Sequence, residues 1–214
     1  MRRVRRGRFI SFEGGEGTGK STQLRLLAER LRAQGLAVET TREPGGSPGA
    51  EELRRLLLNG AADRWSPLAE ALLMNAARTD HLERTIRPAL GRGAWVLCDR
   101  FADSTRAYQG AAGGVNDAFL RALERQVTEG AKPDLTLVLD APAALGLERA
   151  AARAGGEARF ESKGLAFHEA LRAAFRRIAA EESGRCVLID AAAPVEAVAA
   201  QVEEAVRARL LQPA

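Results

Sequence analysis

The stretch FEGGEGTGKST, at positions 12–22, has the spacing of a phosphate-binding loop, G-x-x-x-x-G-K-S. Its glycines allow the backbone to turn several N–H groups toward phosphate oxygens, and the helix that follows directs its positive end at the same anion. Lys20 is expected to reach the outer phosphates and Ser21 to bind Mg²⁺. The loop therefore predicts a site for a nucleoside triphosphate. Its predicted binding residues are Gly14, Gly15, Glu16, Gly17, Thr18, Gly19, Lys20, Ser21 and Thr22.

Glu16 is an unusual residue inside such a loop, because a carboxylate beside phosphates repels them. One interpretation is a solvent-facing side chain with no role. The other is that Glu16 points away from the triphosphate, toward a donor on a second substrate such as a sugar hydroxyl.

Charged residues also stand at the ends of two other strand-like runs. Arg42 comes directly after the run at 36–41, whereas Asp99 ends the run at 94–99 and Arg100 follows it. Asp99 is placed to hold Mg²⁺ or its water, and Arg100 to bind a phosphate. The alternative for the Asp-Arg pair is a surface ion pair of little energetic value. Two arginines beside a phosphate loop favour phosphate recognition at two places.

Two helical segments carry further candidates. Met74 and Arg78 are four residues apart, so they share one helical face and could line a pocket for a base. The other interpretation is that the methionine packs in the core and the arginine is solvated. Arginines around the flexible pair Gly155-Gly156 suit a lid, at about 149–164, that closes on a polyphosphate, although a solvated helix end explains them equally well. These arginines are Arg149, Arg153 and Arg159.

The elements that must position these residues follow from the apolar pattern. Segments with apolar residues three and four apart, typical of helices, separate short apolar or β-branched runs, typical of strands. The predicted strands lie at 8–13, 36–41, 94–99, 134–140 and 185–190. This alternation predicts a parallel sheet with helices on both faces, in which ligands bind at the carboxyl ends of the strands.

Composition is consistent with one compact domain. The chain has 214 residues, of which 46% are hydrophobic and 28% charged, and a net charge of +4. The segment at 1–7 is predicted to be a basic extension, with the domain at 8–214. No apolar run approaches the roughly 20 residues of a membrane span. Cys98 and Cys186 lie in apolar runs without metal-ligand spacing, which predicts buried thiols and a reducing compartment, the cytoplasm.

Several longer stretches, in order along most of the chain, resemble the thymidylate kinase family. They are TREPGG, DRFADSTRAYQG and KPDLTLVLD, together with the phosphate loop. The resemblance implies a three-layer α/β fold of the P-loop nucleoside monophosphate kinases with a five-stranded parallel sheet. It also implies ATP- and Mg²⁺-dependent phosphorylation of dTMP to dTDP in dTTP biosynthesis, by a homodimer that pairs through long helices including that at 66–91.

The resemblance also implies an acceptor site. Arg42 and Arg100 would hold the dTMP phosphate, and Glu43 with Pro44 would shape that site through a cis peptide bond. Met74 stands where many members have a Phe that stacks on thymine, and Phe101 where Tyr or His is common. The implied dTMP-binding residues are Glu16, Arg42, Pro44, Met74, Arg78, Arg100, Ser104, Thr105, Tyr108 and Gln109.

Individual roles at that site follow from the same resemblance. Arg78 would donate a hydrogen bond to thymine, and Thr105 and Gln109 would complete base recognition. Tyr108 would occupy the space of a ribose 2′-hydroxyl and so favour deoxyribose. Glu16 would face the dTMP sugar.

The phosphate loop has Glu16, Gly17 and Thr18 where one style of the family places a catalytic arginine. The chain therefore resembles the bacterial style, in which the lid supplies that arginine. Arg153 is the implied catalytic lid residue, and Arg149 would contact ATP. The implied catalytic residues are Lys20, Asp99, Arg100 and Arg153, and the implied Mg²⁺ ligands are Ser21 and Asp99.

Three other functions remain open on the sequence. One is a kinase for dUMP or for pyrimidine monophosphates more broadly. Another is a nucleotide-dependent switch that hydrolyses ATP without an acceptor, although DRFADSTRAYQG then has no explanation. The third is a basic nucleic-acid-binding protein that uses the N-terminal arginines, but no recognised nucleic-acid module accompanies them.

Overall fold

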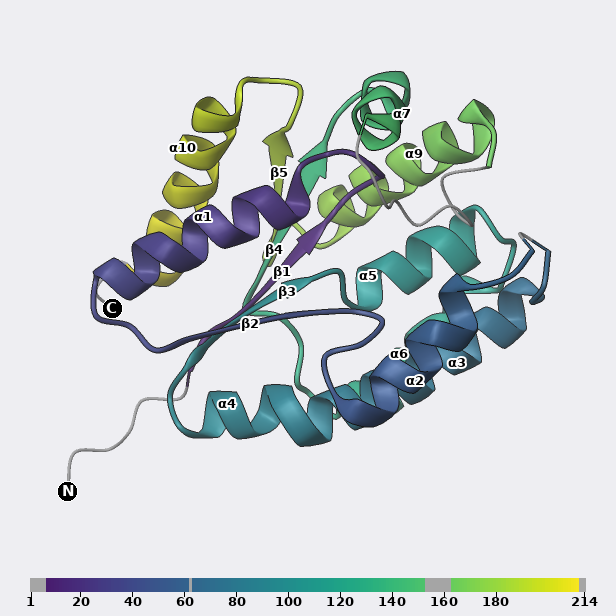
Figure 1. Cartoon of the computed structure of the whole chain (residues 1–214), viewed down its shortest axis with the longest axis horizontal. Coiled ribbons are helices and arrows are strands. Elements are labelled where there is room, and N and C mark those ends of the chain that lie inside the picture. The colour runs from purple at the N-terminus through teal and green to yellow at the C-terminus, as the bar shows by residue number, and fades with distance from the viewer. Residues whose placement is uncertain (1–6, 62, 153–162, 212–214) are drawn as a thin grey trace.

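A five-stranded parallel sheet forms the centre of the molecule (Figure 1). The computed structural model describes residues 7–61, 63–152 and 163–211. The sheet has the order β2-β3-β1-β4-β5, and every adjacent pair is parallel. Its strands are β1 (Phe9–Glu13), β2 (Val38–Arg42), β3 (Trp95–Asp99), β4 (Leu135–Asp140) and β5 (Cys186–Asp190). The predicted five-stranded parallel sheet is confirmed.

Helices cover both faces of this sheet, which gives three layers (Figure 1). One face carries α1 (Lys20–Ala33) and α10 (Val195–Val206), which pack on each other and on the sheet. The other face carries α4 (Arg87–Gly91) and α9 (Leu165–Glu181). The remaining helices on that side are α2 (Pro48–Leu58), α3 (Pro67–His81), α5 (Ala102–Thr105) and α6 (Asp117–Thr128), while α7 (Ala143–Ala151) follows β4.

The central strand β1 shows how the sheet directs its side chains. Ile10 and Phe12 pack in the core beneath α1 and α10, whereas Phe9 packs in the opposite core with α4. Because successive side chains on a strand alternate between faces, Ser11 and Glu13 share the side of Phe9. The last carboxylate of β1 therefore points toward the face that carries α5.

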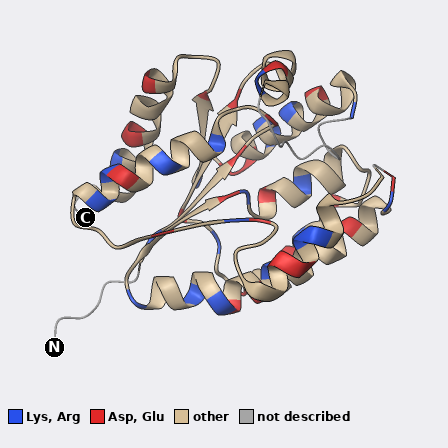
Figure 2. Ribbon diagram, in the orientation of Figure 1, with Lys and Arg blue, Asp and Glu red and all other residues tan. Residues whose placement is uncertain are grey.

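Charged residues collect at one end of the strands. All five strands end in a charged residue, and Figure 2 shows the red and blue segments at these ends and along the helices. The five are Glu13, Arg42, Asp99, Asp140 and Asp190. In a parallel sheet these carboxyl ends meet at a single edge, so the sheet itself brings one arginine and four acidic side chains to the same edge.

Two helical regions differ from the sequence-based expectation. The helix expected at 66–91 is helical from Pro67 to Gly91 but contains a π-helical segment, Leu82–Ile86, between α3 and α4. Pro88 lacks an N–H group and cannot continue the regular hydrogen-bond ladder, which explains a change of helix type there. The chain from Ala102 to Ala111 is also helical, as α5 and a second π-helical segment, Arg106–Ala111. Most of its residues are buried and several of these are polar, among them Asp103, Arg106 and Gln109, so the segment lacks the apolar spacing that indicates a helix in sequence.

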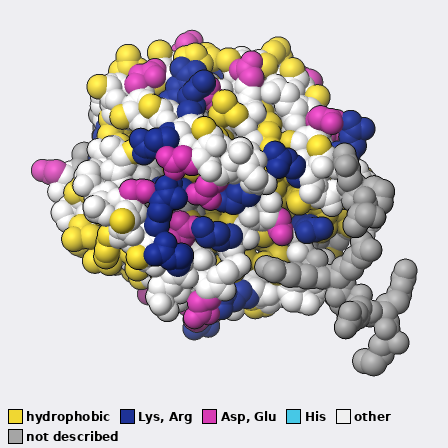
Figure 3. Space-filling model, turned by 180° about the vertical axis from the view of Figure 1, so that it is seen from behind, with side chains coloured by type: hydrophobic (Ala, Val, Ile, Leu, Met, Phe, Trp, Pro, Cys, Tyr) yellow, Lys and Arg dark blue, Asp and Glu magenta, His cyan; other side chains and the backbone are white. Residues whose placement is uncertain are grey.

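The surface carries many ion pairs. From behind, Lys and Arg side chains interleave with Asp and Glu side chains across the middle of the face (Figure 3). Among the described helices, none is long and apolar enough to cross a membrane. Cys98 and Cys186 are free and buried, as predicted. The predicted basic extension lies almost entirely outside the described residues, as does the lid beyond residue 152.

Candidate functional site

The phosphate loop links the end of β1 to the start of α1. Gly17 and Gly19 have φ values of 64° and 85°, which glycine adopts without steric cost. The Lys20 ammonium lies inside the curve of the loop, where it donates to the carbonyl oxygens of Gly15 at 2.6 Å and Gly14 at 3.2 Å. Burial and the neighbouring Arg100 lower the pKa of Lys20 to about 8. A buried cation surrounded by inward-facing backbone is suited to bind phosphate oxygens.

Arg100 connects this loop to a second pocket. It follows β3 directly and has a left-handed backbone, φ 68°, which turns the chain sharply out of the sheet. Its guanidinium donates to the Gly14 carbonyl oxygen at 3.0 Å and to the Glu16 carboxylate at 2.8 Å. The guanidinium carbon also lies 4.9 Å from the centre of the Tyr108 ring, within the range of a cation–π interaction.

Glu16 is held by two donors at the wall of this pocket. One carboxylate oxygen accepts from Arg100 and from the Tyr108 hydroxyl, the latter at 2.6 Å. Burial alone would raise the pKa of Glu16, but the charges of Arg100 and Lys20 outweigh it and lower the pKa to about 2. Glu16 is therefore ionised throughout the neutral range.

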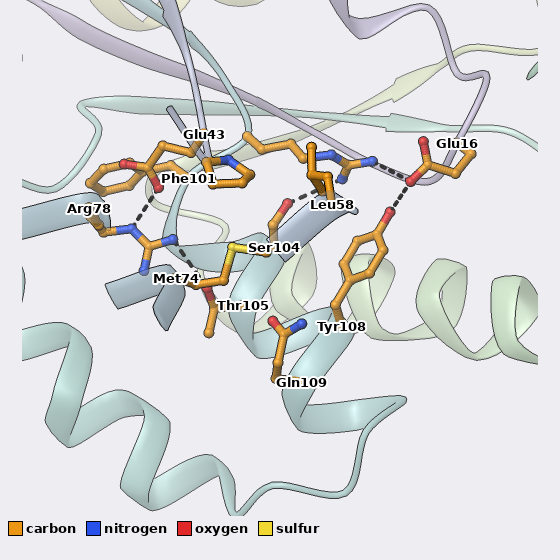
Figure 4. Close-up of a pocket in the computed structure, with 12 residues that line it drawn as sticks. Glu16, Glu43, Leu58, Met74, Arg78, Phe101, Ser104, Thr105, Tyr108 and Gln109 are labelled. Carbon is orange, nitrogen blue, oxygen red and sulfur yellow. Dashed lines mark hydrogen bonds and ion pairs between the residues drawn. The ribbon is translucent and has the colours of Figure 1, made fainter. Parts of the chain in front are cut away.

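The second pocket lies between the phosphate loop and α3, and its empty space, including the open mouth, is about 420 Å³. Figure 4 shows its side chains converging from several elements. Those named by the sequence analysis are Glu16, Glu43, Pro44, Met74, Arg78, Arg100, Phe101, Ser104, Thr105, Tyr108 and Gln109. The Glu43–Pro44 peptide bond is cis, as predicted. The structure thus brings together nine of the ten residues predicted to bind the acceptor.

Arg78 forms the far wall of the pocket and is held rigidly. It donates to the Glu43 carboxylate at 2.7 Å, to Asn75 Oδ1 at 3.1 Å and to Thr105 Oγ1 at 3.1 Å. The guanidinium carbon also lies 5.1 Å from the centre of the Phe101 ring. With only 2% of the side chain exposed, Arg78 is a fixed cluster of hydrogen-bond donors beside the half-buried Met74.

Arg42 is the predicted acceptor residue that does not line this pocket. Its side chain is 54% exposed and pairs with Glu51 at 3.0 Å. Arg42 and a backbone N–H at Gly46 both bind the Glu51 carboxylate and lower its pKa, with the Gly46 contribution the larger. The structure therefore places Arg42 at the rim of the site, in an ion pair.

Two residues of the site have no counterpart in the sequence-based prediction. Leu58, the last residue of α2, lines this second pocket, but one more leucine in an apolar helical pattern carries no signal. Glu13 is fully buried and accepts from the Phe101 backbone N–H at 2.7 Å and from the Ser104 hydroxyl at 2.6 Å. Burial and the nearby Asp103 raise the pKa of Glu13 to about 8. An acidic residue that ends an otherwise apolar strand is the signal that could have found it.

Ser21 and Asp99 offer oxygen atoms of the kind that Mg²⁺ prefers. Ser21 is exposed at the start of α1 and Asp99 is half-buried at the end of β3. Asp99 is close enough to Lys20 and Arg100 to act on both: its charge partly opposes the lowering of the Lys20 pKa and contributes to the raised pKa of Arg100. The described residues include no cluster of three His, Cys, Asp or Glu side chains placed for a metal. A hydroxyl and one carboxylate fit an ion that takes its other ligands from phosphates and water.

The arginines of the predicted lid are only partly within the described chain. Arg149, on α7, donates to the Ala191 carbonyl oxygen at 2.8 Å, which places it beside the loop that follows β5. Arg153 and Arg159 lie outside the described residues.

The lowered pKa of Glu16 generates a prediction about stability. Because the folded-state pKa, about 2, is below the ordinary value of 4.5, ionised Glu16 stabilises the fold above pH 4.5 and this contribution disappears as the pH falls toward 2. We expect Glu16→Gln to lower the free energy of unfolding by about 3 kcal/mol at pH 7, and by less than half of that at pH 3. Urea denaturation of both proteins at the two pH values measures this. If the wild type and Glu16→Gln differ in the free energy of unfolding by the same amount at pH 7 and pH 3, the assigned charge interaction is wrong.

Comparison with known proteins places this geometry in a family. The family model described as Thymidylate kinase matches residues 12–202. A thymidylate kinase from Caulobacter vibrioides is 65% identical over 204 residues, covering 95% of this chain and 98% of that protein. A thymidylate kinase from Bradyrhizobium diazoefficiens is 56% identical, covering 96% of this chain and 91% of that protein.

A solved structure agrees with the fold. The crystal structure of thymidylate kinase from Ehrlichia chaffeensis aligns with a TM-score of 0.76 at 32% identity, and the alignment covers 94% of this chain and 98% of that chain. On its sequence and its fold, the chain belongs to the thymidylate kinase family.

Proposed function

We propose that the chain transfers the γ-phosphoryl group of ATP to a phosphate oxygen of dTMP, giving ADP and dTDP. The position of Arg100 is the observation that carries this proposal. Its guanidinium contacts Gly14 of the phosphate loop and Glu16 on the pocket wall, so one cation lies between two places where anions would bind. Such an arrangement opposes the repulsion between the phosphates of the donor and of the acceptor.

The acceptor nucleotide would lie in the second pocket in a single orientation. Its base would lie beside Arg78 and Met74, with its phosphate at Arg100 near the phosphate loop. Glu16 and Tyr108 would then face the sugar between them. The Tyr108 ring fills the wall at that point, which supports the predicted preference for a deoxyribose.

The donor nucleotide fits the phosphate loop, with Lys20 at its outer phosphates. Mg²⁺, held by the Ser21 hydroxyl and by Asp99 directly or through water, would neutralise charge on the phosphates when bound. From the lid we propose Arg153 as the catalytic arginine and Arg149 as a contact for ATP. In the transfer, an acceptor phosphate oxygen bonds to the γ-phosphorus as its bond to the β–γ bridging oxygen breaks, and ADP leaves with that electron pair. The acceptor oxygen is already anionic, so no strong general base is required.

Turnover measurements test this function. ADP release with Mg²⁺ and ATP should depend on dTMP, and in Arg100→Ala the value of kcat/KM for dTMP should fall by roughly 100-fold or more, because a buried charge contact is lost. Arg92→Ala is a matched control, because this exposed arginine pairs with Glu39 away from the pocket. ADP release that is indifferent to dTMP would sink the proposal and favour an ATP-hydrolysing switch.

We also propose a cytoplasmic homodimer that pairs through α3. Two leucines four residues apart on that helix, Leu68 and Leu72, are 48% and 49% exposed. Leu56 on the adjacent α2 and Phe119 on the adjacent α6 are also exposed. Neighbouring apolar side chains at a surface favour burial against another chain, and a two-fold dimer would bring two copies of this patch together.

Sedimentation equilibrium tests the homodimer. The wild-type chain should sediment with twice its monomer mass, and Leu72→Glu should shift it toward the monomer because a charge in an apolar interface is costly. Leu165→Glu is the control, since Leu165 is similarly exposed but begins α9. A monomeric wild-type chain would refute the proposal, as would a Leu72→Glu variant that remains dimeric.

A further inference from the structure

Gln109 is held by a carboxylate that no role at the site has yet used. Its amide nitrogen donates to Glu70 Oε2 at 2.9 Å. Both side chains are buried, with 2% of Gln109 and 4% of Glu70 exposed. Glu70 lies in the first turn of α3, whereas Gln109 lies in the π-helical segment Arg106–Ala111. The contact therefore joins two walls of the acceptor pocket.

The chemistry of this contact fixes the orientation of the amide. Glu70 accepts this hydrogen bond through a carboxyl oxygen, so the NH₂ group of Gln109 faces Glu70. The carbonyl oxygen must then face the other way. Figure 4 shows that oxygen on the side of Met74 and Thr105, with the nitrogen turned away from them. Gln109 therefore presents an acceptor to the pocket that it lines.

Arg78 presents the opposite polarity from its own wall. A guanidinium has five N–H donors and no acceptor. The three nitrogens of Arg78 donate one hydrogen bond each, to Glu43, Asn75 and Thr105, and the remaining N–H groups can donate to a base. The pocket thus offers donors from Arg78 and an acceptor from Gln109. A base edge with a carbonyl oxygen beside a ring N–H complements this pair.

Thymine and uracil carry such a keto-imide edge, whereas cytosine carries the reverse. Cytosine has an amino group where they have O4 and an unprotonated nitrogen where they have N3–H. In this pocket its amino group would face the donors of Arg78 and its ring nitrogen would face the oxygen of Gln109. Buried donor–donor and acceptor–acceptor contacts leave both partners unsatisfied, which is costly.

We propose that Glu70 is a positioning residue that determines base specificity, because it locks the Gln109 amide with its oxygen toward the pocket and so selects keto-imide bases over amino bases. The inference rests on the proposed function, since it assumes that a pyrimidine monophosphate binds with its base beside Arg78. Glu70 acts through Gln109 and is not required to touch the substrate.

The variant Glu70→Gln separates this role from simple packing. Glutamine has nearly the same shape, but its amide can donate as well as accept. The Gln109 amide is then free to reverse and to present its NH₂ group to the base. Glu124→Gln is the matched control, because Glu124 is also a buried glutamate, 7% exposed, and pairs with Lys132.

Steady-state kinetics with dTMP and dCMP test the proposal. The ratio of kcat/KM for dTMP to that for dCMP should fall by about tenfold or more in Glu70→Gln, chiefly through KM, and should stay unchanged in Glu124→Gln. A ratio that does not change in Glu70→Gln would overturn the inference, as would an equal loss for both nucleotides. If the proposed function itself is wrong, the result is different: the wild-type chain does not phosphorylate dTMP at all.

A second variant covers the case in which Glu70→Gln does not fold. Gln109→Leu removes the acceptor itself and should lower the same ratio by a similar factor, with the circular dichroism spectrum of the wild type. If Gln109→Leu folds and keeps the wild-type ratio, the Gln109 oxygen does not read the base and the assignment of Glu70 is wrong.

Discussion

One arginine holds the two halves of this site together. Arg100 leaves the sheet at the end of β3 in a left-handed conformation, and its guanidinium then binds both the Gly14 carbonyl oxygen and the Glu16 carboxylate. The phosphate loop is thereby tied to the helix that follows Arg100. If this contact is lost, a buried carboxylate remains without its main counter-charge, and the pocket loses the cation that would face the acceptor phosphate.

Around that contact, the two buried glutamates of the loop region have opposite pKa shifts. Glu16 stays ionised because Arg100 and Lys20 are near, whereas burial and the neighbouring Asp103 raise the pKa of Glu13. Glu13 also binds the Phe101 N–H and the Ser104 hydroxyl, and so supports the sharp turn at Arg100 from below. Hydrogen bonds within the protein therefore hold these groups in place without a nucleotide, which is the arrangement that electrostatic preorganisation requires.

Much of this arrangement could be predicted from the sequence, because the phosphate loop and the strand ends are each specified by a few adjacent residues. The five strands follow from short apolar runs. Since the carboxyl ends of parallel strands meet, Asp99 and Arg100 were expected near the loop. For these features local chemistry and the topology of the sheet were sufficient.

Other features depend on pairings between distant segments, and the sequence does not reveal them. Glu70 and Gln109 are 39 residues apart, and no pattern predicts that one orients the other. The helix over Ala102–Ala111 was missed because it is buried on most sides. Arg42 was expected directly after a strand and is the last residue of β2, yet a nearby carboxylate, Glu51, holds it at the rim.

Calorimetric titration of dTMP and of thymidine into the wild-type chain and into Arg100→Gln tests the role of Arg100 most directly. The two ligands differ only in the phosphate. We expect the variant to lose about 10- to 100-fold more affinity for dTMP than for thymidine, because only dTMP loses a charge-assisted hydrogen bond to its phosphate. Equal losses for both ligands, or no loss for dTMP, would contradict the assignment of Arg100 to the acceptor phosphate.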